Sequence, residues 1–73
     1  MITASIDVGA VTTKVVILRE GKVIGDSIVT TGIEQKKSAE QALDEAIKKA
    51  GISRSDIEHI SATGTCSKVT WDA

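Results

Sequence analysis

The sequence is poor in the side chains that bind nucleic acid. It contains no phenylalanine or tyrosine and one tryptophan (Trp71), and its net charge is −1. Adjacent lysines occur only as two pairs, Lys36-Lys37 and Lys48-Lys49. Nucleic-acid-binding domains usually present clustered positive charge, and those that bind single strands add aromatic side chains on which bases stack. The composition therefore argues against nucleic acid as a partner.

Cysteine and long apolar runs are scarce as well. Cys66 is the only cysteine, so an internal disulfide is excluded and a disulfide-stapled secreted scaffold is not indicated. Residues 1–18 are rather apolar, but Asp7, Gly9 and Lys14 interrupt them and no basic region leads them. This pattern argues against a signal peptide or a membrane span. We therefore expect a cytoplasmic protein without a membrane partner.

Proline is absent, and neither an internal repeat nor a low-complexity segment marks a boundary. Residues 1–73 are therefore predicted to form a single domain. A folded chain of this size buries only about 60–65% of the surface that its unfolded form exposes. We expect modest stability, to which a partner surface would add.

Three strands are predicted in the first half of the chain. Residues 2–6 alternate between apolar and polar side chains, as in a strand with one buried face. Residues 15–18 form a short, mostly β-branched apolar run that suits a strand covered on both sides. A two-residue turn at Glu20-Gly21 then leads into a third strand over residues 22–30. These three strands are expected to be antiparallel.

A helix and a fourth strand follow. Ser38 and Gln41 have the spacing of a capping box, which predicts that the helix begins at Ser38. Alanines at helical spacing form a narrow apolar stripe, and Gly51 suits the left-handed cap that ends a helix. So many alanines indicate a helix that lies close against a sheet. Residues 57–62 are the fourth predicted strand, and a glycine-containing loop is expected at Thr63-Gly64-Thr65.

The predicted fold class is therefore α/β, as a small α+β domain with the order β-β-β-α-β. A strand that is reached through a helix normally returns parallel to the sheet. We expect three antiparallel strands plus one parallel strand, with the helix on one face. The third strand would leave an open sheet edge, through which two copies of the chain are able to pair.

The stretch SIDVGAVTTK, residues 5–14, admits two interpretations. As a phosphate-binding loop, it offers a glycine that lets the backbone approach a ligand, successive amides, two threonine hydroxyls and Lys14. Asp7 would repel phosphate unless Mg²⁺ lay between them, so the loop indicates a metal–nucleotide site. The alternative is a plain hairpin between two strands, since Asp-Val-Gly is also common in turns that bind no ligand. The Walker spacing and the G-x-G-x-x-G pattern are both absent.

The run SIDVGAVTTKVVIL, together with ISATGT at residues 60–65, favours the phosphate loop. Here the chain resembles the amino-terminal part of an ATPase family. That family comprises activators of 2-hydroxyacyl-CoA dehydratases and ATP-binding subunits of benzoyl-CoA reductase, within the actin, Hsp70 and sugar-kinase superfamily. The resemblance extends over essentially the whole chain. It implies a ribonuclease H-like core and ATP or ADP with Mg²⁺ as cofactor.

The resemblance also implies roles for individual residues. Asp7 would orient Mg²⁺ through water, while loop amides and threonine hydroxyls would hold the β- and γ-phosphates. The implied cofactor-binding residues are Asp7, Gly9, Ala10, Val11, Thr12, Thr13 and Lys14. Thr63, Gly64 and Thr65 would form a second loop. No catalytic residue is assigned.

Two departures from the family limit what the resemblance implies. The family usually has Ser or Thr where this chain has Ala10, and it continues the second loop with a Gly and an Arg that are replaced here. A second Asp-x-Gly loop and the cysteines of a shared iron–sulfur cluster are missing from this sequence. Cys66 alone does not suffice for a cluster, which takes several thiolates.

The predicted function is therefore the first phosphate-binding subdomain of such an ATPase, without a second lobe. In the family, ATP hydrolysis drives electron transfer from an iron–sulfur cluster to a partner, an acyl-CoA dehydratase or reductase. The 73-residue chain alone is not expected to catalyse hydrolysis. Two alternatives remain open: a non-enzymatic, self-associating module or gene remnant, and a fragment of a sugar- or acetate-kinase-like protein.

Overall fold

The computed structural model describes residues 1–64 of the chain. Its elements are β1 (Ile2–Val8), β2 (Thr12–Arg19), β3 (Lys22–Thr30), α1 (Gln35–Ala50), the 3₁₀ turn η1 (Arg54–Asp56) and β4 (His59–Gly64). The strands form one mixed sheet in the order β3-β2-β1-β4. Neighbouring strands are antiparallel except β1 and β4, which are parallel. The predicted fold class and element order are confirmed.

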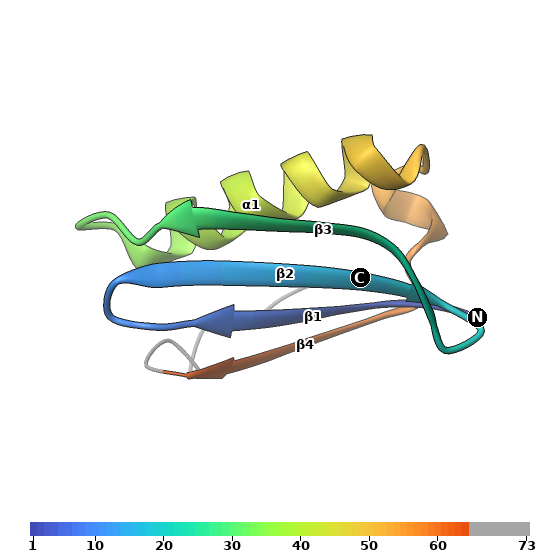
Figure 1. Cartoon of the computed structure of the whole chain (residues 1–73), viewed down its shortest axis with the longest axis horizontal. Helices are drawn as coiled ribbons and strands as arrows, with labels where there is room; N and C mark the ends of the chain where they lie inside the picture. Colours follow the sequence, from blue (N-terminus) through green and yellow to red (C-terminus); the bar gives the residue numbers. More distant parts are fainter. Residues whose placement is uncertain (65–73) are drawn as a thin grey trace.

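The core lies between α1 and one face of the sheet. Figure 1 shows α1 running along one side of the strands, and its contacts are mostly with β3 and β2. Alternate residues of β1 and β2 point into this layer, as a period of two requires. The buried apolar side chains are Ile2, Ala4, Ile6, Val8, Val15, Ile17, Ala39, Ala42, Leu43, Ala46 and Ile57. The alanines allow the helix to lie close to the sheet, as the sequence indicated.

The opposite face of the sheet is not covered by any helix of residues 1–64. Val16 and Leu18 point to this face and are half-buried, whereas Ile28 on the neighbouring strand is exposed. The expectation that residues 15–18 are covered on both sides is therefore wrong for the described part of the chain. An unbroken apolar run does not distinguish a doubly covered strand from one with a partly shielded outer face.

The two turns that depend on glycine form as predicted. Glu20 and Gly21 both have positive φ, 50° and 79°, which is the geometry of a tight turn between antiparallel strands. Gly51 follows α1 at φ 71°, and its N–H donates to the carbonyl oxygen of Ile47 at 3.1 Å. The β2–β3 hairpin and the end of α1 are thus both confirmed.

The helix begins earlier than the sequence predicted. α1 starts at Gln35, so Ser38 lies inside the first turn and not at the cap. The Ser38 hydroxyl accepts a hydrogen bond from the Gly32 N–H at 2.8 Å, and Ser38 is buried. The predicted capping box at Ser38 is wrong. The Ser38 hydroxyl instead links the first turn of the helix to Gly32 in the connection before it. Both roles require a hydroxyl, so the residue type does not distinguish them.

The fourth strand is displaced by two residues from its predicted span. Ile57 is buried in the core but precedes β4, which occupies His59–Gly64. Thr63 and Gly64 therefore belong to the end of a strand, and the prediction that they form a loop is wrong. The other predicted residue of that loop, Thr65, lies outside the described residues, as does Cys66. Within residues 1–64, no helix is long and apolar enough to cross a membrane.

Gly25 permits the close contact between β3 and α1. A Cβ atom at this position would lie 2.6 Å from the Ala46 carbonyl oxygen and 2.9 Å from the Ala50 Cβ. Neither obstacle is a flexible side chain, so a methyl group here would push the helix away from the sheet. The close approach of α1 therefore explains why a glycine stands in the middle of β3.

We predict that Gly25→Ala lowers the free energy of unfolding by about 1–3 kcal/mol, the usual cost of overpacking a core. Urea unfolding followed by circular dichroism would measure it. Gly32→Ala is the matched control, because a Cβ there meets only the Ser38 Oγ at 3.5 Å. Its stability is expected to stay within about 1 kcal/mol of the parent. Equal midpoints for the two variants would contradict the close packing.

Candidate functional site

Three segments meet at one end of the sheet, where β1, β3 and β4 finish. The β1–β2 loop (residues 9–11), the β3–α1 connection (residues 31–34) and the end of β4 lie together at the left of Figure 1. The Thr31 N–H donates to the Val11 carbonyl oxygen at 2.8 Å, which ties the connection to the loop. Gly64 is the register partner of Val8, which places the end of β4 beside the start of the loop.

The β1–β2 loop presents exposed backbone at its tip. The Gly9 N–H donates to the Thr12 carbonyl oxygen at 2.9 Å and closes the loop. Ala10 and Val11 are exposed, and their N–H groups have no hydrogen-bond partner within residues 1–64. A Cβ at Gly9 would stand 3.0 Å from the same Thr12 oxygen, so a larger residue would crowd this closure. The loop therefore keeps two donors available to a ligand.

Thr31 fixes the loop from the side of β3, and the sequence analysis did not identify it. Its hydroxyl donates to the Gly9 carbonyl oxygen at 2.9 Å and lies 2.8 Å from the Thr13 hydroxyl. Because one hydroxyl has a single proton to donate, Thr13 must be the donor in the second bond. A threonine beside a glycine at a strand end carries no signal of such a contact, which joins residues 22 positions apart.

The two threonines of the motif lie in different environments. Thr12 is exposed at the start of β2. Thr13 is fully buried on the helix side, and its hydroxyl is engaged by Thr31. The structure thus leaves one of the two predicted hydroxyl donors, that of Thr12, on the accessible surface.

Asp7, Lys14 and Thr63 form a row across the uncovered face of the sheet. In the strand register, Asp7 is paired with Lys14 on β2 and with Thr63 on β4, and all three are exposed. Facing residues on neighbouring strands lie close enough for their side chains to interact. Neither Asp7 nor Lys14 takes part in an ion pair within residues 1–64.

This row fits a hydrated cation better than a directly bound one. Among the described residues, no three His, Cys, Asp or Glu side chains gather into a metal site. One free carboxylate beside a loop with free amides matches the way Mg²⁺ is held, through water and few carboxylates, with the remaining ligands from phosphate. Asp7 supplies the carboxylate of this row, and Mg²⁺ held through water is the form of cation that one such carboxylate suits.

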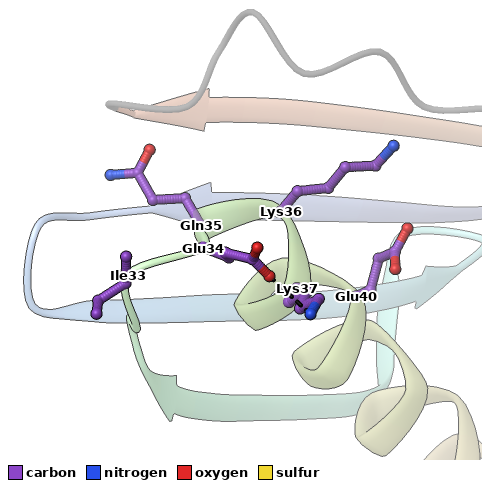
Figure 2. Close-up of a pocket in the computed structure, with 6 residues that line it drawn as sticks. All are labelled: Ile33, Glu34, Gln35, Lys36, Lys37 and Glu40. Carbon is purple, nitrogen blue, oxygen red and sulfur yellow. Dashed lines mark ion pairs between the residues drawn. The ribbon is translucent and has the colours of Figure 1, made fainter.

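A separate hollow of about 570 Å³ lies at the beginning of α1. Its lining residues are Ile33, Glu34, Gln35, Lys36, Lys37 and Glu40. Figure 2 shows the Glu34–Lys37 ion pair, whose atoms are 2.8 Å apart, within this lining. None of the predicted phosphate-binding residues contributes to it, and its lysines and glutamates are balanced in charge.

The comparisons with known proteins identify sequence relatives among dehydratase activators. No family model matches the chain. It is 37% identical over 65 residues to an activator of lactoyl-CoA dehydratase from Anaerotignum propionicum, a match that covers 88% of this chain and 25% of that protein. The chain thus spans about a quarter of the length of this relative.

Solved structures show the same relationship in the fold. The activator of 2-hydroxyisocaproyl-CoA dehydratase from Clostridium difficile, with bound ADPNP, matches all of this chain and 27% of its own, with TM-score 0.86 and 27% identity. Component A of (R)-2-hydroxyglutaryl-CoA dehydratase from Acidaminococcus fermentans matches 93% of this chain and 26% of its own, with TM-score 0.84 and 26% identity.

A structure with lower sequence identity shares only the fold with this chain. The ROK hexokinase from Thermus thermophilus matches 88% of this chain and 22% of its own, with TM-score 0.75 and 18% identity. The element order is therefore shared with a sugar kinase, whereas sequence similarity accompanies it in the activators. The partial coverage of the activators fits the amino-terminal part that the sequence indicated.

Hydrogen exchange would test the geometry of the loop. We predict that the Ala10 and Val11 amides exchange at rates near those of an unstructured chain, since neither is bonded within residues 1–64. The Gly9 amide should exchange more slowly because it is bonded to Thr12. Two-dimensional NMR after transfer to D₂O would measure the rates. Protection of Ala10 equal to that of Ile6, in the middle of β1, would show that the loop amides are engaged.

Proposed function

We propose that this chain, which shares sequence and fold with activators of 2-hydroxyacyl-CoA dehydratases over about a quarter of their length, binds the phosphate tail of Mg-ATP or Mg-ADP. The observation that carries the proposal is the loop tip, where the Ala10 and Val11 amides lack partners within residues 1–64. The related C. difficile activator was solved with the nucleotide ADPNP, which supports a nucleotide as the ligand.

Several of the predicted residues have a part in this proposal. The amides of the loop donate to phosphate oxygens, as successive N–H groups in a turn do at other anion sites. Thr12 adds its hydroxyl, and Lys14 adds positive charge from the adjacent strand. Asp7 holds Mg²⁺ through water on the same face as Lys14. Magnesium supplies charge neutralisation between the Asp7 carboxylate and the phosphates.

Binding is expected to be weak and without sustained hydrolysis by this chain alone. A few hydrogen bonds of about 0.5–1.5 kcal/mol each correspond to a dissociation constant on the order of 1 mM. Phosphoryl transfer needs charge stabilisation and positioning from several directions. Residues 1–64 supply contacts from one direction, through the β1–β2 loop and the row beside it. In a longer protein of the activator type, this segment would serve a dehydratase or reductase partner.

The proposal predicts that Asp7→Asn weakens Mg-ADP binding about tenfold, because it removes the charge that holds the hydrated cation. Amide shifts of Gly9, Ala10 and Val11 during a Mg-ADP titration would give both dissociation constants. Asp26→Asn is the matched control, since Asp26 is also exposed and lies on β3, away from the loop. Equal losses in the two variants would show a general charge effect and contradict the proposal.

One observation favours a second candidate, self-association of the chain without enzymatic activity. β3 is an edge strand, and its Val23 and Ile28 are 61% and 65% exposed. Unpaired edges of this kind tend to pair with further strands. A second copy that pairs along β3 would satisfy the open backbone groups of this edge.

Self-association predicts that the sedimentation coefficient of the chain rises with its concentration. Ile28→Lys, which puts a charge on the exposed edge, should restore a monomer and leave the thermal midpoint within a few degrees of the parent. Analytical ultracentrifugation would measure the first effect and circular dichroism the second. A monomeric parent chain at high concentration would rule this candidate out.

A further inference from the structure

We infer that Thr31 is a positioning residue that holds the β1–β2 loop in the shape required for phosphate before a ligand arrives. The inference rests on the proposed function and adds a residue from outside the motif. Thr31 makes three hydrogen bonds to this region: its N–H to the Val11 oxygen at 2.8 Å, its hydroxyl to the Gly9 oxygen at 2.9 Å, and the bond at 2.8 Å with the Thr13 hydroxyl.

These bonds orient the first and the last of the three peptide groups between Gly9 and Thr12. The N–H and C=O of a trans peptide point in opposite directions, and the chain has no cis peptide bond within its described residues. Since the Gly9 carbonyl faces Thr31, the Ala10 N–H points away from it. The Val11 carbonyl also faces Thr31, so the Thr12 N–H points away as well. Thr31 thus orients the two peptide groups that flank the loop tip alike, with both carbonyls toward it and both N–H groups away from it.

Thr31 is itself held firmly. The buried Thr13 hydroxyl donates to the Thr31 hydroxyl, which leaves the Thr31 proton for the Gly9 carbonyl. The next residue, Gly32, donates its N–H to Ser38 in the first turn of α1. The loop is thereby connected through Thr31 to both β2 and the helix. A loop that is ordered beforehand loses less conformational entropy when it binds.

The test compares three variants of the 73-residue chain. Thr31→Val removes the hydroxyl but keeps the branched shape and the backbone N–H, whereas Thr31→Ser keeps the hydroxyl. Thr30→Val is the matched control, because Thr30 is the exposed threonine immediately before Thr31. The probes are Mg-ADP and Mg-tripolyphosphate, each titrated while amide shifts are followed. Thermal midpoints are recorded alongside.

We expect Thr31→Val to weaken both probes about three- to tenfold, the equivalent of one hydrogen bond. Thr31→Ser and Thr30→Val should bind within about twofold of the parent. A purely structural role would lower the thermal midpoint of Thr31→Val and leave its affinity unchanged, which would overturn the inference alone. Failure of the parent chain to bind either probe would overturn the proposed function and the inference together.

A measurement on the parent chain keeps the inference testable should Thr31→Val not fold. ¹⁵N relaxation without ligand should give Ala10 and Val11 order parameters close to the value of about 0.85 that is typical of rigid backbone. Values below about 0.6, as in flexible loops, would show that Thr31 does not order the loop and would overturn the inference.

Discussion

The close contact of α1 with the sheet is the constraint on which the other features depend. It requires small residues on both sides: Gly25 in β3 faces Ala46 and Ala50 in the helix. Serine hydroxyls form hydrogen bonds with backbone atoms along the seam, that is, the line of contact of α1 with β3 and with the connection between them. Ser27 in β3 donates to the Ala42 carbonyl of the helix, and Ser38 accepts from Gly32. Buried polar groups are tolerated when they are paired in this way.

This seam determines where the β3–α1 connection lies. With Gly32 bonded to the first helical turn, Thr31 is placed beside the β1–β2 loop, where it contacts two of the loop carbonyls. A shift of α1 away from β3 would therefore disturb the Gly32–Ser38 hydrogen bond, which lies next to Thr31. Two adjacent residues, Thr31 and Gly32, therefore connect the helix to the candidate site.

The sequence predicted the fold well because its signals are local or periodic. Alternation in β1, the Glu20-Gly21 turn and the Gly51 cap each depend on a few neighbouring residues. Boundaries that depend on distant contacts were predicted less well. The spacing of Ser38 and Gln41 predicts a cap, but the hydroxyl of Ser38 instead binds the N–H of Gly32, which lies outside the helix. Ile57 suggested an early start of β4, since burial alone does not distinguish a strand from the chain that precedes it.

The candidate site shows the same division between local and distant information. Asp7 lies on the uncovered face because Ile6 and Val8, its neighbours, are buried at 1% exposure and side chains alternate along a strand. That placement follows from the sequence pattern. The contrasting environments of Thr12 and Thr13 follow from it too, once β2 is known to begin at Thr12. The contact of Thr31 with Gly9 does not, because it joins residues 22 positions apart and no local spacing marks it.

Strand alternation gives the two sides of the loop different tasks. On the helix side, the buried Thr13 hydroxyl donates to the half-buried Thr31 hydroxyl, which in turn donates to the Gly9 carbonyl of the loop. On the other side, Asp7 and Lys14 remain exposed, with opposite charges in register. A slip of β1 by one residue relative to β2 would bury Asp7 and expose Ile6 and Val8. Burial of these two apolar side chains therefore stabilises the register that keeps the carboxylate beside the open amides, so that folding and the chemistry of the site select the same pairing.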